Sequence, residues 1–186
     1  MPLIRETVVT TLAADGTPHL APLGLIAGEE DGRWIAAPFH PSTTLANLRA
    51  VPELVANYVD DVRIFAGCLT GRRDFPLLPG SRLRPPRLAA ALAHAEMRVV
   101  AVEADETRPR FHCEIVWEAS HAPFQGFNRA QAAVIEAAIL YSRRHLLARE
   151  TIDAEMRRLA IPVAKTAGAE ELVAWEWLVG AFETEF

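Results

Sequence analysis

The sequence lacks the features that mark secreted, membrane-spanning and nucleic-acid-binding proteins. It has two cysteines in 186 residues, Cys68 and Cys113, and they form no Cys-x-x-Cys pair, so we expect buried thiols and no disulfide framework. It contains no run of about 18 apolar residues and no apolar signal region near residue 1, so we expect neither a membrane span nor secretion. A formal net charge of −5 argues against nucleic-acid binding, which depends on clustered Lys and Arg. These absences predict a cytoplasmic protein.

Motifs for metals and for common nucleotide folds are also missing. The 6 histidines never occur at a metal-binding spacing with a nearby acid, so we expect no metal site. His112 and Cys113 are neighbours, and adjacent side chains on a strand point to opposite faces, so they cannot share one metal. The sequence contains no GxGxxG, no P-loop and no GxSxG, which excludes the sequence signals of a Rossmann domain, a P-loop NTPase and an α/β-hydrolase.

What is present in the first two thirds of the chain is mostly β-structure. Asp15-Gly16 and Asp31-Gly32 are hairpin signals that separate runs rich in β-branched residues. The pattern predicts strands over 7–12, 19–26, 33–39, 54–58, 97–103 and 111–119. Residues 60–71 fit either a short helix or a strand, 75–86 is a Pro- and Arg-rich loop, and 87–94 predicts a short Ala-rich helix.

The last third is helical. Apolar residues at a spacing of 3–4 predict helices over 128–147, 151–164 and 170–182, and we expect Pro162 to kink or end the second of them. The predicted fold class is therefore α+β, mainly β and antiparallel, with a barrel domain over 1–125 and a helical C-terminal extension over 126–186.

The segment WIAAPFHPSTTLANLRAVPELVANY, residues 34–58, contains the first candidate site. An apolar strand stops at His40-Pro41 and is followed by three hydroxyl residues, Ser42, Thr43 and Thr44, at the start of a short helix over 42–50. A helix start offers unpaired backbone N–H groups and the positive end of the helix dipole, so this segment is a candidate phosphate site. The alternative is that Ser42 only caps the helix and the threonines are surface residues.

Several longer stretches strengthen this interpretation. DGTPHLAPLG, PFHPSTTLANLR, NYVDDVRIFAGCLTGRRDFP and HAPFQGFNRAQAAVIEAAI together resemble the split-barrel family called domain of unknown function 447, over nearly the whole chain. That family is flavin reductase-like and occurs in methanogenic archaea and in methylotrophic bacteria that use tetrahydromethanopterin-linked one-carbon metabolism. The resemblance implies an FMN-binding split barrel with Greek-key-like connections, a three-helix extension and a homodimer. It implies no particular reaction.

The candidate site residues follow from these two arguments. The expected cofactor-binding set is His19, Phe39, His40, Ser42, Thr43, Thr44, Asn47, Arg63 and Arg72. Arg5 and Arg73 are further candidates for neutralising the phosphate, because a helix terminus supplies only about half a charge. A second candidate pocket consists of His121, Asn128 and Arg129, near Phe124 and Gly126. The alternatives are a hydrogen-bonded His19 at the edge of the core, a helix cap at Asn128 and solvated arginines; no catalytic acid or base is assigned.

The sequence thus predicts an FMN-binding protein and a flavin-dependent oxidoreductase whose substrate is unknown. The alternative is a non-enzymatic binding module or carrier for flavin, a pterin or another phosphorylated metabolite. We expect a homodimer, because a half-open barrel leaves a strand edge exposed and the apolar side of strand 111–117 exceeds what a barrel interior needs. The helical extension covering that surface within one chain is the alternative.

Overall fold

The structure is a computed structural model that describes residues 2–185. The chain forms two compact units, each built from two separate stretches. The first runs up to Val59 and resumes over Phe75–Pro123; the second consists of Asp60–Asp74 and the chain from Phe124 onwards. The sequence predicted a single boundary at residue 125. The structure differs from this expectation, because 60–74 belongs with the helices.

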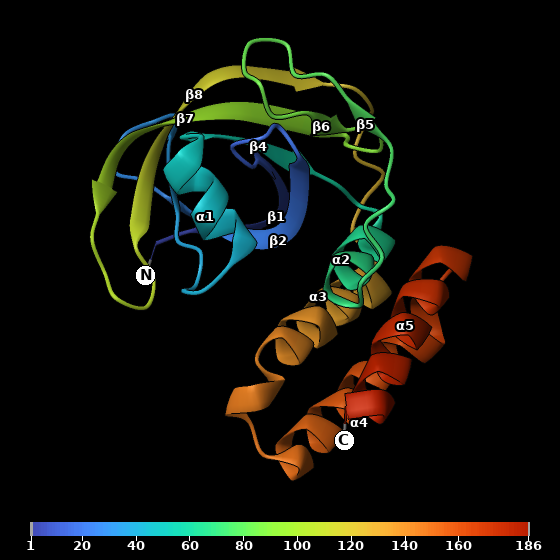
Figure 1. Ribbon diagram of the computed structural model, residues 1–186. Helices are drawn as coiled ribbons and strands as arrows, with labels where there is room; N and C mark the ends of the chain where they lie inside the picture. The colour runs from blue at the N-terminus through green and yellow to red at the C-terminus, as the bar shows by residue number, and fades with distance from the viewer. Residues whose placement is uncertain (1, 186) are drawn as a thin grey trace. The chain divides into compact units, whose positions relative to one another are not determined.

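The first unit is a closed antiparallel barrel (Figure 1). Its strands are β1 (Ile4–Leu12), β2 (Pro18–Ala27), β3 (Arg33–Ala36), β4 (Glu53–Tyr58), β7 (Ala93–Glu103) and β8 (Arg110–Ser120). Around the barrel the order is β1-β2-β3-β8-β7-β4, and β1 closes it by pairing with both β2 and β4. The expectation of a half-open barrel with an exposed edge is therefore wrong.

Two glycine turns set the register of the first hairpins. Gly16 and Gly32 have φ values of 87° and 76°, a region that favours glycine because it has no Cβ. The Asp15 carboxylate accepts a hydrogen bond from the Thr17 backbone N–H at 2.9 Å, which fixes the first turn. The hairpins predicted from Asp-Gly are confirmed.

The barrel interior is apolar and is closed at one end by helix α1 (Thr43–Ala50). Leu45 and Leu48 of α1 pack into the same buried cluster as Val9, Leu54 and Met97 of the strands. Because side chains alternate along a strand, Val8, Thr10, Val55 and Asn57 face outward from the barrel. These four residues are nonetheless buried.

The outer face of β1, β4 and β7 is buried because the segment 75–91 crosses it. This segment contains two short paired strands, β5 (Leu77–Leu78) and β6 (Arg87–Leu88). The side-chain oxygen of Asn57 accepts the Leu88 N–H at 2.7 Å, and Leu88 is fully buried. The helix predicted over 87–94 is wrong, because these residues form β6, a turn and the start of β7.

A β-bulge changes which β8 residues face inward. The register with β7 shifts between Glu96 and Met97, so that Trp117 lies opposite Glu96 on the covered outer face. Phe111 is 2% exposed inside the barrel, whereas Trp117 is 39% exposed. The sequence pattern had placed both residues on one apolar face. Both arguments for a homodimer from the sequence are therefore weakened: the excess apolar surface on strand 111–117 and the exposed strand edge.

The second unit is a helical bundle (Figure 1). Its elements are α2 (Val62–Leu69), α3 (Arg129–Ser142), the short 3₁₀ turn η1 (Arg144–Leu146), α4 (Arg149–Thr166) and α5 (Ala169–Glu185). Val62 and Ala66 of α2 are buried in one cluster with Ala137 of α3 and Leu178 of α5. The ambiguous segment 60–71 is thus a helix, and its apolar side completes the core of the bundle.

The three predicted C-terminal helices are confirmed as α3, α4 and α5. Of the kink or end expected at Pro162, the end is wrong, since α4 continues through this residue to Thr166. The Thr166 hydroxyl donates to the Pro162 carbonyl at 2.8 Å in the last turn. Within residues 2–185, no helix has both the length and the apolar character needed to cross a bilayer.

Candidate functional site

The segment between β3 and α1 is held by the loop that joins β7 to β8. Arg108 donates two hydrogen bonds to the Ala37 carbonyl, at 3.1 and 3.0 Å. The same guanidinium lies 4.3 Å from the centre of the Phe39 ring. The His40 N–H donates to the Thr107 carbonyl at 2.8 Å. The start of α1 is therefore fixed by contacts far away in sequence.

The start of α1 has the geometry of an anion site. Ser42 is the N-cap, in extended conformation, and its hydroxyl oxygen accepts the Leu45 N–H at 3.2 Å. This leaves the N–H groups of Thr43 and Thr44, which have no acceptor within the helix. Thr43 is exposed and Thr44 is buried, so the two hydroxyls lie at different depths. Donors and dipole together favour a negative group here.

Asn47 and His19 lie at the same end of the barrel. The Asn47 side-chain amide donates to the Thr11 hydroxyl at 3.1 Å, and both residues are buried. His19 on β2 is paired directly with Thr11 on β1, and paired residues project from the same face of a sheet. The structure thus brings His19, Asn47 and the start of α1 together. Asn47 also has a structural role, because its hydrogen bond to Thr11 links α1 to β1.

The candidate arginines do not share one location. Arg63 and Arg72 belong to the helical unit, as does Arg73, which is exposed. Arg63 binds Asp61 through two hydrogen bonds, at 2.9 and 2.8 Å, and Glu170 at 2.8 Å. The hydrogen bonds that Arg63 donates to the Asp61 carboxylate raise the pKa of Arg63 above its usual value.

The remaining two candidate cations pack against tryptophans. Arg72 lies over the ring of Trp177 at 4.6 Å within the helical unit. Arg5 lies in the barrel, 5.8 Å from the ring of Trp34.

The residues of the second candidate pocket fall in different units. Asn128 caps α3: its side-chain oxygen accepts the Ala130 N–H at 2.7 Å, and its amide donates to the Thr166 carbonyl at 3.0 Å. Arg129 is exposed in the same helical unit, whereas His121 belongs to the barrel unit. The capping alternative for Asn128 is confirmed.

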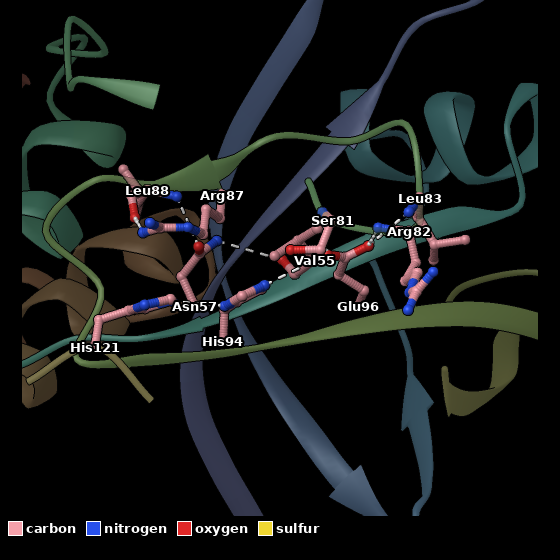
Figure 2. Close-up of polar contacts among 10 residues, drawn as sticks. All are labelled: Val55, Asn57, Ser81, Arg82, Leu83, Arg87, Leu88, His94, Glu96 and His121. Atoms are coloured by element: carbon pink, nitrogen blue, oxygen red, sulfur yellow. Dashed lines mark hydrogen bonds and ion pairs between the residues drawn. The ribbon is translucent and has the colours of Figure 1, made fainter. Parts of the chain in front are cut away.

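A buried carboxylate that the sequence did not single out lies on the covered outer face. Glu96 is 0% exposed, and its oxygens accept backbone N–H bonds from Ser81, Arg82 and Leu83, the Arg82 bond being 2.8 Å long. Burial alone would raise the pKa of Glu96, but these N–H donors and a contact with His94 outweigh it and lower the pKa. Figure 2 shows the three backbone donors converging on the carboxylate.

Two histidines continue from Glu96 toward the surface. Nε2 of His94 lies 3.4 Å from Oε1 of Glu96, and Nδ1 of His94 lies 2.8 Å from Nε2 of His121. His94 is 1% exposed, whereas His121 is exposed. Burial lowers the pKa of His121, and nearby Arg87 and His94 lower it further.

Two cavities among the described residues of the barrel unit have different linings. One of about 330 Å³ lies between α1 and the β7–β8 hairpin, with Leu48, Val99 and Phe111 in its wall. The other, of about 680 Å³, is lined in part by Arg33 and Arg110. Arg33 forms an ion pair with Glu114 at 2.8 Å, and Arg110 forms one with Glu103 at 3.3 Å, so both positive charges have a partner. Among the described residues, no three His, Cys, Asp or Glu side chains are grouped so as to hold a metal ion.

The sequence found the start of α1 but missed Arg108, Glu96 and His94. Ser42 is recognisable because an N-cap is a local signal. Arg108 lies in the turn ADETRP, where it resembles an ordinary surface charge. His94 lies in 87–94, which resembles a helix, and Glu96 lies between that segment and the predicted strand 97–103. A His-x-Glu spacing on a strand is the one available signal, since such residues share a face.

Comparisons with known proteins agree on the fold. A solved structure of an FMN-bound protein from Methanosarcina mazei is 21% identical, with a TM-score of 0.84 over 97% of this chain and 96% of that one. A 2-nitrobenzoate 2-nitroreductase from Pseudomonas fluorescens is 23% identical, with a TM-score of 0.54 over 65% and 66%. A flavoredoxin from Methanosarcina acetivorans is 17% identical, with a TM-score of 0.52 over 65% and 69%. The barrel is thus the split barrel that the sequence predicted.

The family models cover both units. A search of curated proteins gave no match. The model described as "Protein of unknown function (DUF447) N-terminal domain" matches residues 5–122, and the one described as "Protein of unknown function (DUF447)" matches 128–180. The chain therefore belongs to the DUF447 family, as its sequence motifs indicated.

Proposed function

We propose that this chain binds FMN and acts as a flavin-dependent oxidoreductase. The observation that carries the proposal is the near full-length similarity to an FMN-bound protein of the same family, with a TM-score of 0.84. The nitroreductase and the flavoredoxin, which each match over 65% of this chain, support redox chemistry on this fold. FMN supplies the hydride or electron transfer when it is bound, and the protein's task is to hold and orient it.

The residues at the start of α1 fit the FMN phosphate. The N–H groups of Thr43 and Thr44 are available there, their hydroxyls add donors, and the adjacent helix dipole favours the anion. Phe39, 47% exposed, and the neighbouring His40 are the side chains at this end with surface for a flat ring. His19 and Asn47 approach from β2 and α1.

A phosphate that is close to a dianion needs a cation as well as a helix terminus. Arg108 is the guanidinium that contacts this segment, through Ala37 and Phe39. We therefore add Arg108 to the four arginines considered from the sequence. Replacing each of the five in turn, and measuring the salt dependence of FMN affinity, identifies the one that contributes.

The first experiment is the visible absorption spectrum of the purified protein, followed by titration of the apoprotein with FMN. Flavin bands and tight binding are expected. Bleaching of the bound flavin by NADH or NADPH supports an oxidoreductase with a nicotinamide donor. Tight binding without reduction by any donor supports the alternative, a carrier. Failure to bind FMN while a pterin or another phosphorylated metabolite binds would contradict the proposal.

The phosphate position is tested with the double variant Thr43→Val and Thr44→Val. Valine keeps the shape and removes the hydroxyl donors. Each lost hydrogen bond to a charged group costs about 1.5–3 kcal/mol, so the affinity should fall by about two to four orders of magnitude. The control is Thr151→Val on exposed α4. Unchanged FMN affinity in the double variant would exclude this position.

The homodimer also stays a proposal. The resemblance to the split-barrel family implies a homodimer, and a two-fold dimer is the commonest soluble assembly. Sedimentation at micromolar concentration should give a species of about 41 kDa, twice the 20.5 kDa of one chain. A monomer that still binds FMN tightly would show that one chain builds the whole site.

A further inference from the structure

Three titratable side chains form a continuous row along the outer face of β7. Figure 2 shows His121, His94 and Glu96 in this order, and their exposure falls along it, since His121 is exposed while His94 and Glu96 are buried. His94 and Glu96 are two residues apart on β7 and therefore share a face. The His121 backbone N–H donates to the Leu92 carbonyl at 2.7 Å, which anchors this residue beside the start of β7.

The two imidazole rings are oriented for a hydrogen bond between ring nitrogens. Their planes are 13° apart and their centroids are 5.0 Å apart, while the facing nitrogens are 2.8 Å apart. The centroid distance exceeds the nitrogen distance by about one ring radius on each side, so the rings lie edge to edge and nearly coplanar. A nitrogen lone pair lies in the ring plane, so this arrangement directs it at the neighbouring N–H.

The contacts of Glu96 dictate where the protons are. All three backbone groups at its carboxylate are donors, so the carboxylate accepts from each of them and is an anion. Nε2 of His94 then carries a proton and donates toward Glu96. In neutral His94 the other nitrogen, Nδ1, is an acceptor, so Nε2 of His121 donates to it. This leaves Nδ1 of the exposed His121 as a lone pair facing outward.

We propose that His121, His94 and Glu96 form a proton relay whose surface end is Nδ1 of His121. A proton from a weak acid outside binds to Nδ1 of His121, and the proton on its Nε2 passes to Nδ1 of His94. His94 becomes an imidazolium beside the Glu96 carboxylate, and the donor leaves as its conjugate base. The reverse sequence delivers a proton to a substrate. The relay is a general acid–base site for groups that ionise near neutral pH.

The neighbouring elements leave Glu96 as the anion that stabilises protonated His94. Opposite His94 are Asn57 on β4 and Ala119 on β8, both uncharged. Asn57 is engaged with the Val8 carbonyl at 2.9 Å and the Leu88 N–H at 2.7 Å. From β6, Arg87 opposes a positive charge on the relay and lowers the pKa of His121, after the larger effect of burial.

The relay is tested on the apoprotein by histidine ¹⁵N NMR, so the outcome does not depend on FMN binding. Above neutral pH we expect His121 and His94 both as Nε2–H tautomers. On acidification the Nδ1 signals of the two residues should change together at one pH. In Glu96→Gln that pH should fall by about one unit, a tenfold loss of proton affinity, because the anion is gone.

A second variant is needed because Glu96→Gln can also disturb the backbone of residues 81–83, whose N–H groups bind Glu96. His121→Phe keeps a flat ring beside His94 and removes the surface nitrogen. The Nδ1 signal of His94 should then lose its shared pH-dependent change, while exposed His145→Phe leaves it intact. A His121 that carries its proton on Nδ1 above neutral pH, before acidification, overturns the proposal, and so does independent titration of the two residues.

Discussion

Replacing Glu96 with Gln measures what a buried carboxylate contributes to the stability of the barrel. The carboxylate accepts N–H groups from Ser81, Arg82 and Leu83, whereas a Gln side chain offers one oxygen and an NH₂ group that cannot accept. A hydrogen bond to a charged group contributes about 1.5–3 kcal/mol, and an unpaired buried N–H costs about 1–3 kcal/mol.

The burial of the three N–H donors determines how much stability is lost when the Glu96 carboxylate is removed. Ser81 and Arg82 are exposed, so water replaces the lost acceptor, but Leu83 is 7% exposed and its N–H is not readily hydrated. We therefore expect the free energy of unfolding to fall by about 2–5 kcal/mol.

The effect of Glu96→Gln should depend on pH with a definite sign. The pKa of Glu96 in the folded protein is lowered, since the N–H donors outweigh the opposing effect of burial. A carboxyl group with a lowered folded pKa adds stability above its unfolded pKa, about 4.3, and loses it as the pH falls through the folded pKa. The difference in the free energy of unfolding between wild type and variant should be largest at neutral pH and should vanish in acid.

The assay is urea unfolding of both proteins, combined with hydrogen exchange at the Leu83 amide. Exchange reports on the barrel unit alone, which matters because two units need not unfold together. The control is Glu118→Gln, an exposed carboxylate on β8. If Glu96→Gln lowers the free energy of unfolding by less than about 1 kcal/mol, or by the same amount in neutral and acid solution, the role assigned to the N–H donors is refuted.

Three further predictions address other parts of the chain. Ser42→Ala removes the N-cap bond to Leu45 and should destabilise the barrel unit by about 1 kcal/mol in thermal unfolding, whereas Ser42→Gly should cost a few tenths. Arg63→Met breaks ion pairs that are partly exposed, so double-mutant cycles should give about 1 kcal/mol or less per pair; a larger coupling contradicts this. Burial raises the pKa of Cys68 to about 11 and that of Cys113 to about 12, so both thiols should react slowly with a thiol reagent at neutral pH until urea is added. Rapid reaction in the native protein would show that one of them is accessible.

Most of the barrel was predictable because its signals are local. Asp15-Gly16 and Asp31-Gly32 identify turns, and β-branched alternation identifies the strands between them. Ser42 identifies the start of α1 because an N-cap needs only a hydroxyl and the N–H three residues later. The prediction over 87–94 failed because Ala and Leu favour a helix locally, while pairing with Asn57 and the rest of β4 requires an extended chain.

The candidate site was predictable only in part, for the same reason. Arg108 and the segment that it contacts at Ala37 are 71 residues apart, and no local pattern joins them. The same holds for Glu96, which the sequence shows as an ordinary charged residue just before the predicted strand 97–103. Its burial depends on the 75–91 segment crossing the outer face.

The family, the antiparallel strands, the hydroxyl-capped start of α1 and the three C-terminal helices follow from the amino-acid sequence alone. Each of these rests on residues within a few positions of one another, or on long motifs in the chain. Three features are seen only in the folded chain: the barrel closes through β1 and β4, α2 belongs to the helical unit, and Glu96, His94 and His121 form a row. These features depend on contacts between distant segments, whose burial and pairing energies exceed the local preferences that a sequence pattern records.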